Sequence, residues 1–279
     1  MSKLHRISIG EAELVALQDT WALIPPGDFF DEVEDGAWNA YPEHLTTDGQ
    51  LTLSLTQWLI RSEGQTILVD TGIGNRPTVF PVQDEPALPA VLQEAGVSPD
   101  EIDIVAFTHL HFDHTGWNTV DRDGKPMPLF PNARHVVQQT EWDYWAGGAE
   151  NAASDRATVL DPITEAGLWD FVEGEHALTR EVVTLPTPGH TPGHVSFLLS
   201  SGSEAVILLG DAAHSPLQVG EPEWCIGADV DNVTARRSRR GIWERAERDG
   251  TAIATNHFPF PSVGHVVTVD GKQRWEPSA

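Results

Sequence analysis

Residues 108–114 read Thr108-His109-Leu110-His111-Phe112-Asp113-His114, which places three histidines and an aspartate within six residues. Imidazole and carboxylate groups are preferred ligands of zinc and its borderline neighbours, so this density predicts a metal site. His109 and His111 stand two residues apart and can point the same way where the backbone between them is extended. Asp113 and His114 lie beyond them and can reach a second ion.

The residues around this stretch predict how the ligands are presented. Residues 101–107 are rich in apolar side chains and predict a short buried strand, so the histidines follow its carboxyl end, where α/β proteins usually place their chemistry. Four ligands do not fill two metal sites. Three further candidates each follow an apolar run typical of a strand, namely His190, Asp211 and His257. We therefore expect one binuclear centre assembled at several strand ends.

Taken in this order, the residues resemble the metallo-β-lactamase superfamily. The resemblance rests on His-x-His-x-Asp-His at 109–114 and on the single His, Asp and His that follow. It also rests on Leu-Val-Asp-Thr-Gly at 68–72 and on residues 187–194, where Thr-Pro-Gly-His occurs twice. It covers most of the chain and implies an α/β (α+β) fold, a four-layer αβ/βα sandwich whose site lies at one edge between two sheets.

The resemblance also implies which side chains bind metal. The first ion would take His109, His111 and His190, and the second ion would take Asp113, His114 and His257. Asp211 would bridge the two ions, and Asp70 would orient a ligand histidine. His194 is the rival of His190, but His194 begins the next apolar strand, so we expect His190 to be the ligand. Ligands of this kind suit zinc, with manganese, cobalt and iron as alternatives.

The expected reaction is hydrolysis. Two divalent ions about 3.5–4 Å apart lower the pKa of a bridging water toward ~7 and polarise a substrate oxygen, so hydroxide attacks without a serine or cysteine nucleophile. Asp211 can hold that hydroxide, and Asp113 or Asp211 can carry a proton to the leaving oxygen. We therefore expect Asp113 and Asp211 to be catalytic as well as ligands.

Differences from known branches of the superfamily reduce the number of substrate classes to be expected. Asp211 stands where one group of zinc β-lactamases has a cysteine ligand, and His111 stands where the redox diiron branch has glutamate. Residues 210–218 and 257–261 look closer to the subgroup of methyl parathion hydrolase and related quorum-quenching lactonases. His214 occupies a place where one lactonase group has tyrosine. His214 is expected either to donate a hydrogen bond to the substrate or to brace its loop.

We expect the substrate to be a lactone or carboxyl ester of a small neutral molecule. One alternative is an organophosphate triester, since a phosphotriesterase-like reaction would use the same hydroxide. A non-catalytic protein that holds metal as a binding or sensor module is an alternative of another class. The complete set of ligands argues against that last alternative.

Composition limits the partners. The net charge is −25, with 42 acidic and 17 basic side chains, so phosphate backbones are repelled and nucleic acid is not expected to bind. No segment approaches the ~18 uninterrupted apolar residues of a membrane span, and the first residues lack the apolar core of a secretory signal. A lone cysteine, Cys225, fits a reducing cytoplasm, where we expect the protein.

We expect one domain over residues 1–279. Residues 20–50 mix aromatics, prolines and acids without a steady period, and a structureless insert of that length is usually functional. We expect them to cover the site or to pack across a homodimer interface, with aromatics forming an apolar wall. The alternative is a surface excursion that buries its aromatics locally.

Periodicity and capping residues predict alternating strands and helices. The expected strands are a hairpin over 4–19 and runs at 51–60, 65–70, 133–139, 181–186, 194–200, 204–210 and 252–254. The expected helices are 86–95, which ends at Gly96, then 141–146 and 155–166, and finally 232–249, which ends at Gly250.

Overall fold

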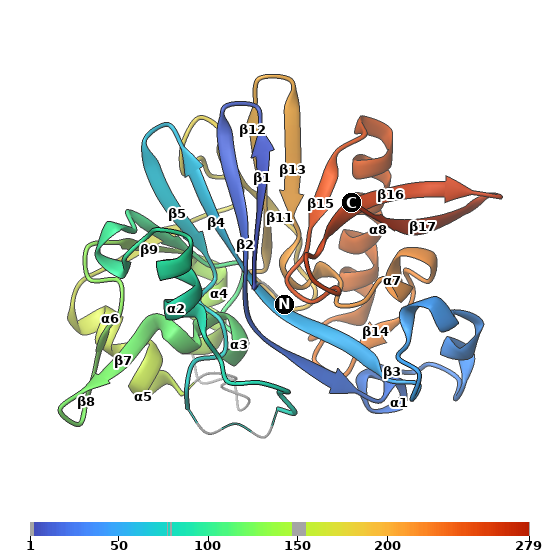
Figure 1. Cartoon of the computed structure of the whole chain (residues 1–279), viewed down its shortest axis with the longest axis horizontal. Helices are drawn as coiled ribbons and strands as arrows, with labels where there is room; N and C mark the ends of the chain where they lie inside the picture. Colours follow the sequence, from blue (N-terminus) through green and yellow to red (C-terminus); the bar gives the residue numbers. More distant parts are fainter. Residues whose placement is uncertain (1–2, 77, 79, 147–154, 279) are drawn as a thin grey trace.

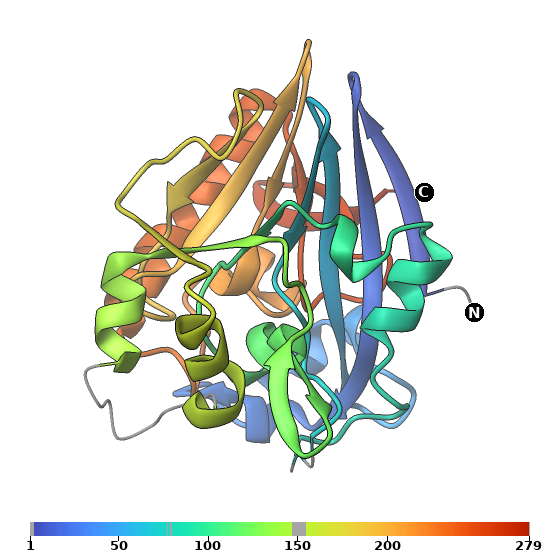
Figure 2. The same ribbon diagram turned by 90° about the vertical axis from the view of Figure 1, so that its left-hand side faces the viewer.

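Two β-sheets stack against each other in the middle of the molecule, and helices cover their outer faces (Figure 1). The structure is a computed structural model, and it describes residues 3–76, 78, 80–146 and 155–278. The view turned by 90° shows the helices of the first half of the chain lying in front of the sheets (Figure 2). The layers therefore run helix, sheet, sheet, helix, which confirms the expected sandwich.

The first sheet has seven strands in the order β1-β2-β4-β5-β6-β9-β10, and the second has six in the order β11-β12-β13-β15-β16-β17. The strands of the first sheet are β1 (Leu4–Ile9), β2 (Ala12–Ile24), β4 (Leu51–Ser62), β5 (Gln65–Val69), β6 (Ile104–Ala106), β9 (Arg134–Gln138) and β10 (Trp169–Val172). Those of the second are β11 (Val182–Pro186), β12 (Val195–Ser201), β13 (Glu204–Leu208), β15 (Ala252–Ala254), β16 (Val263–Val269) and β17 (Lys272–Pro277). Two small ribbons pair β3 (Phe30–Asp31) with β14 (Cys225–Ile226) and β7 (Thr119–Arg122) with β8 (Lys125–Pro128).

Helices of very different length join these strands. The α-helices are α1 (Pro26–Phe29), α2 (Leu88–Glu94), α3 (Phe112–Thr115), α4 (Gln139–Ala146), α5 (Arg156–Val159), α6 (Asp161–Glu165), α7 (Leu217–Gly220) and α8 (Asn232–Asp249). Short 3-10 helices span Ala37–Ala40, Pro42–His44, Pro99–Glu101, Gly116–Asn118 and Gly210–Ala212. None of the described helices is both long enough and apolar enough to cross a membrane.

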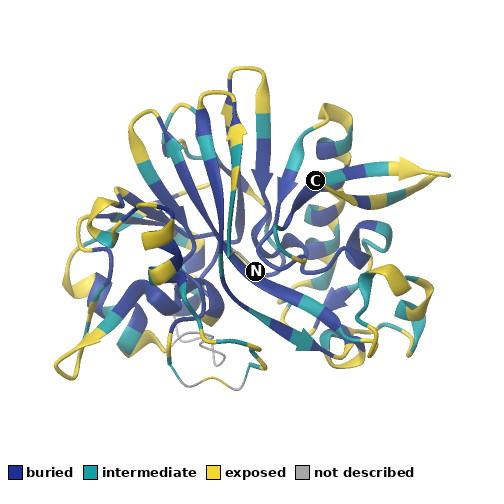
Figure 3. Cartoon of the chain, in the orientation of Figure 1, coloured by how far each residue is buried: buried dark blue, intermediate teal, exposed yellow. Residues whose placement is uncertain are grey.

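Each sheet buries both of its faces, because successive side chains of a strand point to opposite sides. In β2, Leu14 and Ala16 enter the core between the sheets, whereas Val15 and Leu17 enter the core beneath α2. Val206 and Leu208 of β13 face the same central core. Buried residues fill the strands, and exposed residues gather at the hairpin tips (Figure 3).

Parallel pairing of strands determines where the polar segments meet. β5 lies parallel to β6 in the first sheet, and β13 lies parallel to β15 in the second. Carboxyl ends of parallel strands share one edge of a sheet. Asp70 follows β5, residues 108–114 follow β6, Asp211 follows β13 and His257 follows β15. The backbone N–H of Ser54 in β4 donates to the carbonyl of His257 at 3.0 Å, so the two edges are tied together.

The ends of the longest helix, α8, agree with the prediction from sequence. α8 spans Asn232–Asp249 as predicted. Asp231 accepts hydrogen bonds from the backbone N–H groups of Val233 and Thr234, and Gly250 ends the helix in the left-handed conformation. The predicted helix over 155–166 is instead two short helices, α5 and α6.

The expectation that residues 20–50 lack regular structure was wrong for residues 20–24, because these residues continue strand β2. A β-bulge at Asp19 shifts the register between β2 and β4. Such a bulge breaks the period-two alternation that reveals a strand, which is why the pattern did not show the extension. Residues 25–50 then contain α1, β3 and two 3-10 helices.

Several strands were not predicted. The β16–β17 hairpin follows the last predicted strand, and β10 and the β7–β8 ribbon carry mixed polar and apolar residues. β7 and β8 include exposed positions and pair only with each other. Their sequences therefore lack the buried apolar run on which the strand predictions depended.

Candidate metal centre

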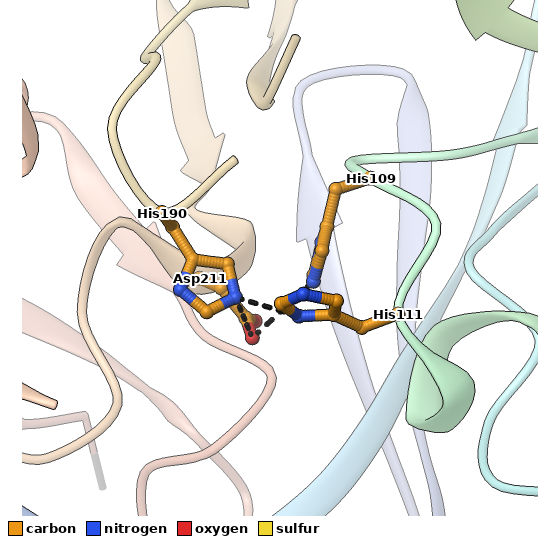
Figure 4. Close-up of side chains that lie close together, drawn as sticks. All are labelled: His109, His111, His190 and Asp211. Carbon is orange, nitrogen blue, oxygen red and sulfur yellow. Dashed lines mark hydrogen bonds and ion pairs between the residues drawn. The ribbon is translucent and has the colours of Figure 1, made fainter. Parts of the chain in front are cut away.

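Seven buried side chains converge where the carboxyl ends of the two parallel pairs meet. They form two groups, and the ligand atoms within each group lie within 4.8 Å of one another. The first group is His109, His111, His190 and Asp211, shown in Figure 4, and the second is Asp113, His114 and His257. All seven residues nominated from the sequence as ligands are therefore brought together.

The first group joins side chains from both sheets. His190 Nε2 lies 2.9 Å from His111 Nδ1 and 3.3 Å from Asp211 Oδ2. His109 Nε2 lies 3.6 Å from the same carboxylate oxygen. That ring nitrogen is buried and makes no hydrogen bond to any described residue. A buried donor atom left without a protein partner fits a site that a cation would complete.

The second group lies on the other side of Asp211. Asp211 Oδ1 is 3.2 Å from His114 Nε2 and 3.1 Å from His257 Nε2. Asp113 Oδ2 lies 3.8 Å from His114 Nε2 and 3.7 Å from His257 Nε2. One oxygen of Asp211 therefore faces each group, and the carboxylate lies between them.

The outer nitrogens of the ligand histidines are held by the protein. Asp70 Oδ2 lies 2.8 Å from His114 Nδ1, and the same carboxylate accepts hydrogen bonds from the backbone N–H and the hydroxyl of Thr108. The hydroxyl of Thr108 in turn lies 3.0 Å from His109 Nδ1. His257 Nδ1 donates to the carbonyl of Ser54 at 3.0 Å. These bonds leave Nε2 of His109, His114 and His257 directed at the centre, whereas His111 presents Nδ1.

The pKa values of the candidate ligand histidines are shifted in opposite directions. Burial lowers the pKa of His109 and His111 well below the ordinary histidine value, and neighbouring imidazoles lower both pKa values further. Burial also opposes the charged form of His114, but the carboxylates of Asp211 and Asp70 outweigh it and raise the pKa of His114 well above its usual range. Because metal ligation needs neutral imidazole, a bound cation would displace the proton that His114 holds.

His194 is close to the centre but outside both groups. Its Nε2 accepts a hydrogen bond from the backbone N–H of Asp211 at 2.8 Å, and its Nδ1 donates to the carbonyl of Thr187 at 3.0 Å. Both ring nitrogens are thus used within the protein. Of the two Thr-Pro-Gly-His histidines, it is His190 that reaches the first group.

His214 contacts the centre through Asp211. Its Nε2 lies 3.0 Å from Asp211 Oδ2, and its ring stacks on His257 with centroids 5.3 Å apart. Its backbone N–H donates to Gln218 Oε1 at 2.7 Å, and Nδ1 has no hydrogen-bond partner among the described residues. The ring therefore braces Asp211 and also has a free nitrogen.

Three buried groups behind the centre were not predicted from the sequence. Asp229 accepts a hydrogen bond from His190 Nδ1 at 2.9 Å, and the fully buried Arg239 of α8 lies 3.5 Å from the other oxygen of Asp229. Burial opposes the charged form of Asp229, but His190 outweighs it and lowers the pKa of that carboxyl. Glu141 of α4 is also fully buried. None of the three residues stands at a fixed distance in sequence from a candidate ligand, so no motif identifies it.

A cavity of about 930 Å³ lies beside the centre. Its walls are mainly apolar and include Ile24, Phe29, Phe80, Phe112 and Val159. Phe112 stands between two candidate ligands and is 37% exposed, while Phe29 of α1 lies edge-on to His214 with centroids 5.9 Å apart. None of the seven candidate ligands lines the cavity, which approaches them through Phe112 and Phe29.

Comparisons with known proteins agree with this geometry. The profile of the metallo-beta-lactamase superfamily matches residues 52–254. The N-acyl homoserine lactonase AttM of Azorhizobium caulinodans is 31% identical over 179 residues, which cover 61% of this chain and 63% of AttM. The lactonase AiiA of Bacillus thuringiensis subsp. kurstaki is 29% identical over 188 residues, which cover 61% of this chain and 68% of AiiA. The match to AttM thus spans less than two thirds of that relative.

Two solved structures share the fold over the whole chain. The hydrolase AbOPH has a TM-score of 0.85 and 24% identity, and the match covers 100% of this chain and 98% of AbOPH. The dizinc quorum-quenching lactonase AidC, solved with a product, has the same TM-score, identity and coverage. The match of the family profile to more than half of the chain, together with this fold, shows that the chain belongs to the metallo-beta-lactamase superfamily.

Proposed function

We propose that the chain is a binuclear metal-dependent hydrolase that cleaves a lactone or carboxyl ester of a small neutral molecule with an apolar arm. The observation that carries the proposal is Asp211, whose two oxygens face two separate groups of histidines. The lactonase relatives support the reaction class. Zinc is the metal we propose, because the ligands are imidazole and carboxylate and because AidC is a dizinc enzyme.

The two groups would each hold one ion, with Asp211 shared between them. Such ions, when bound, supply a hydroxide at neutral pH and polarise the substrate oxygen. The protein contributes fixed geometry, since Asp70, Thr108 and the carbonyl of Ser54 hold the outer nitrogens of three ligand rings. Ligands held in this way need little rearrangement during the reaction.

The remaining chemical steps fall to carboxylates and to His214. Asp113 is more exposed than Asp211, with 8% of its surface accessible against 3%, and a carboxylate there can carry a proton to the leaving oxygen. His214 can donate a hydrogen bond from Nδ1 to the substrate or the leaving group as a cation, or as the tautomer that no longer donates to Asp211, because a neutral ring carries a single N–H. Its contact with Asp211 serves the alternative role of bracing the loop.

The cavity favours a substrate with an apolar arm. Phe112 and Phe29 contribute an apolar surface next to the centre, and the enclosed volume exceeds that of a bare lactone ring. α1 belongs to the segment expected to cover the site, and the contact of Phe29 with His214 supports that role. A neutral substrate also suits a chain with a net charge of −25.

A substrate panel on the zinc-loaded protein tests the proposal. It compares N-acyl homoserine lactones of increasing acyl length, an aryl acetate and an aryl dialkyl phosphate triester. We expect kcat/KM to be higher for the lactones or the aryl ester than for the triester, with about two metal equivalents per chain. A triester turned over far faster than both acyl substrates would overturn the lactonase assignment. Metal binding without any turnover would favour a sensor.

A further inference from the structure

The two candidate groups are tied across the sheets in different ways. The second group is joined by β4, because Ser54 and Thr56 donate backbone hydrogen bonds to the segment that carries His257. The first group needs the loop after β6, which carries His109 and His111, to lie against the β11–β12 loop, which carries His190. The structure shows a separate tie between those two loops.

That tie is the carboxylate of Glu141 in α4. Its Oε1 accepts a hydrogen bond from the backbone N–H of Leu110 at 3.0 Å, between the two ligand histidines of the first loop. Its Oε2 accepts one from the backbone N–H of Gly193 at 3.0 Å, in the loop that carries His190. One buried side chain therefore holds both loops at once.

Packing around Gly193 shows how closely α4 approaches the second loop. A Cβ added at Gly193 would lie 2.3 Å from the backbone nitrogen of Glu141 and 2.6 Å from its Cα. Such distances are far below van der Waals contact, so only glycine fits at this point. The loop is consequently pressed directly onto the start of α4.

Trp145 extends the tie to a candidate ligand. It lies one turn after Glu141, so the two side chains share a face of α4. Its indole N–H donates to Glu141 Oε1 at 2.6 Å. Its ring meets the ring of His111 edge-on, with centroids 5.3 Å apart and an interplanar angle of 66°. Glu141 and Trp145 together therefore contact the ring of His111 and the backbone N–H of the neighbouring Leu110.

We propose that Glu141, supported by Trp145, is a positioning residue that sets the spacing of His111 and His190 and so strengthens metal binding at the first group alone. This inference rests on the proposed metal centre. The two backbone hydrogen bonds need a carboxylate, because the amide nitrogen of a glutamine cannot accept one. Glu141→Gln keeps the shape of the side chain and removes one of the two ties.

Variants with a single remaining group make the test specific. His257→Ala removes a ligand of the second group, and His111→Ala removes a ligand of the first. Zinc affinity is measured in each variant by competition with a chelator, with and without Glu141→Gln. We expect Glu141→Gln to weaken zinc about 10- to 100-fold in the His257→Ala chain and to leave the His111→Ala chain unchanged.

Asp19→Asn is the matched control. Asp19 is also a fully buried carboxylate that accepts backbone hydrogen bonds, from Ile73, Ala87 and Leu88, but it contacts no candidate ligand. We expect this variant to lose thermal stability and to keep its zinc affinity. Trp145→Phe preserves an aromatic ring beside His111 and removes the indole N–H that donates to Glu141. If Glu141→Gln does not fold, this variant tests the positioning role instead. We expect it to weaken the first group by a few-fold.

Equal weakening of both groups, or no change in either, would overturn the positioning role. The absorption spectrum of the cobalt-loaded protein gives a second readout, since a shift confined to the His257→Ala background reports altered geometry at the first group. A parent chain that binds no metal would instead refute the proposed function, so the two failures are distinguishable.

Discussion

The metal centre and the cavity beside it differ in what holds their side chains in place. In the centre, candidate ligands follow strand ends, and buried partners such as Asp70 and Asp229 hold the outer ring nitrogens. In the cavity, the walls come from short elements such as α1 and α3, and aromatic rings pack edge to face, as Phe80 and Phe112 do with centroids 5.8 Å apart. Changes in α1 can therefore alter substrate choice without replacing a ligand, whereas α3 carries both the wall residue Phe112 and the candidate ligands Asp113 and His114.

Asp211→Asn should break the centre most severely, because one carboxylate faces both groups. We expect kcat to fall by more than about 1,000-fold and the metal content to drop below about two equivalents per chain. Steady-state kinetics and elemental analysis measure both effects. Asp100→Asn, at an exposed position, is the control and should change neither quantity. A variant that kept both ions and its rate would refute the shared role of Asp211.

Asp70→Asn tests the supports rather than the ligands. Asp70 holds His114 directly and His109 through the hydroxyl of Thr108, so its loss should weaken both groups. We expect zinc affinity to fall about 10- to 100-fold, as is usual for partners of ligand histidines. Chelator competition measures it. Unchanged affinity would mean that the ligand rings hold their orientation without this carboxylate.

Phe29→Ala tests the cavity alone. Removing the ring that lies against His214 should reduce the preference for long acyl chains by up to about 10-fold in kcat/KM, because each methylene in an apolar pocket contributes modestly. Turnover of a short ester should stay close to that of the parent. Phe171→Ala, at an exposed ring outside the cavity wall, is the matched control. Loss of all substrates together would show that α1 supports the centre as well.

His135→Phe gives the smallest effect and separates the scaffold from the site. Burial lowers the pKa of His135 to about 4, well below the unfolded value near ~6.5, so the unfolded chain binds the extra proton first. Stability is therefore lost as pH falls from ~6.5 toward ~4, by about 1 kcal/mol between pH ~7 and ~5.5. Denaturant unfolding of parent and variant measures the difference. If the stability of the variant depended on pH as strongly as that of the parent, the pH dependence would arise from groups other than His135.

The convergence of the candidate ligands could be predicted because most of these residues are clustered in sequence and follow apolar runs. His109, His111, Asp113 and His114 needed no knowledge of the fold. His190, Asp211 and His257 were predicted only through their order along the chain.

Asp229 and Glu141 could not be predicted, because tertiary packing alone brings them to the ligands. Asp229 precedes α8, and Glu141 lies on a helix that follows β9. Neither stands at a fixed spacing from a histidine. The extension of β2 to Ile24 was not predicted for a local reason. The bulge at Asp19 interrupts the alternation of buried and exposed side chains by which a strand is recognised.

The origin of the candidate ligands, divided between the two parallel strand pairs, links ligand binding to folding. His114 comes from the first sheet and His257 from the second, so neither half of the chain contains a complete group. An ion held there would act as a cross-link between residues far apart in sequence. By mass action, ions present at about 100 times their Kd would add about 2.7 kcal/mol to the free energy of unfolding. The two halves of the sandwich would then unfold as one cooperative unit while the ions stay bound.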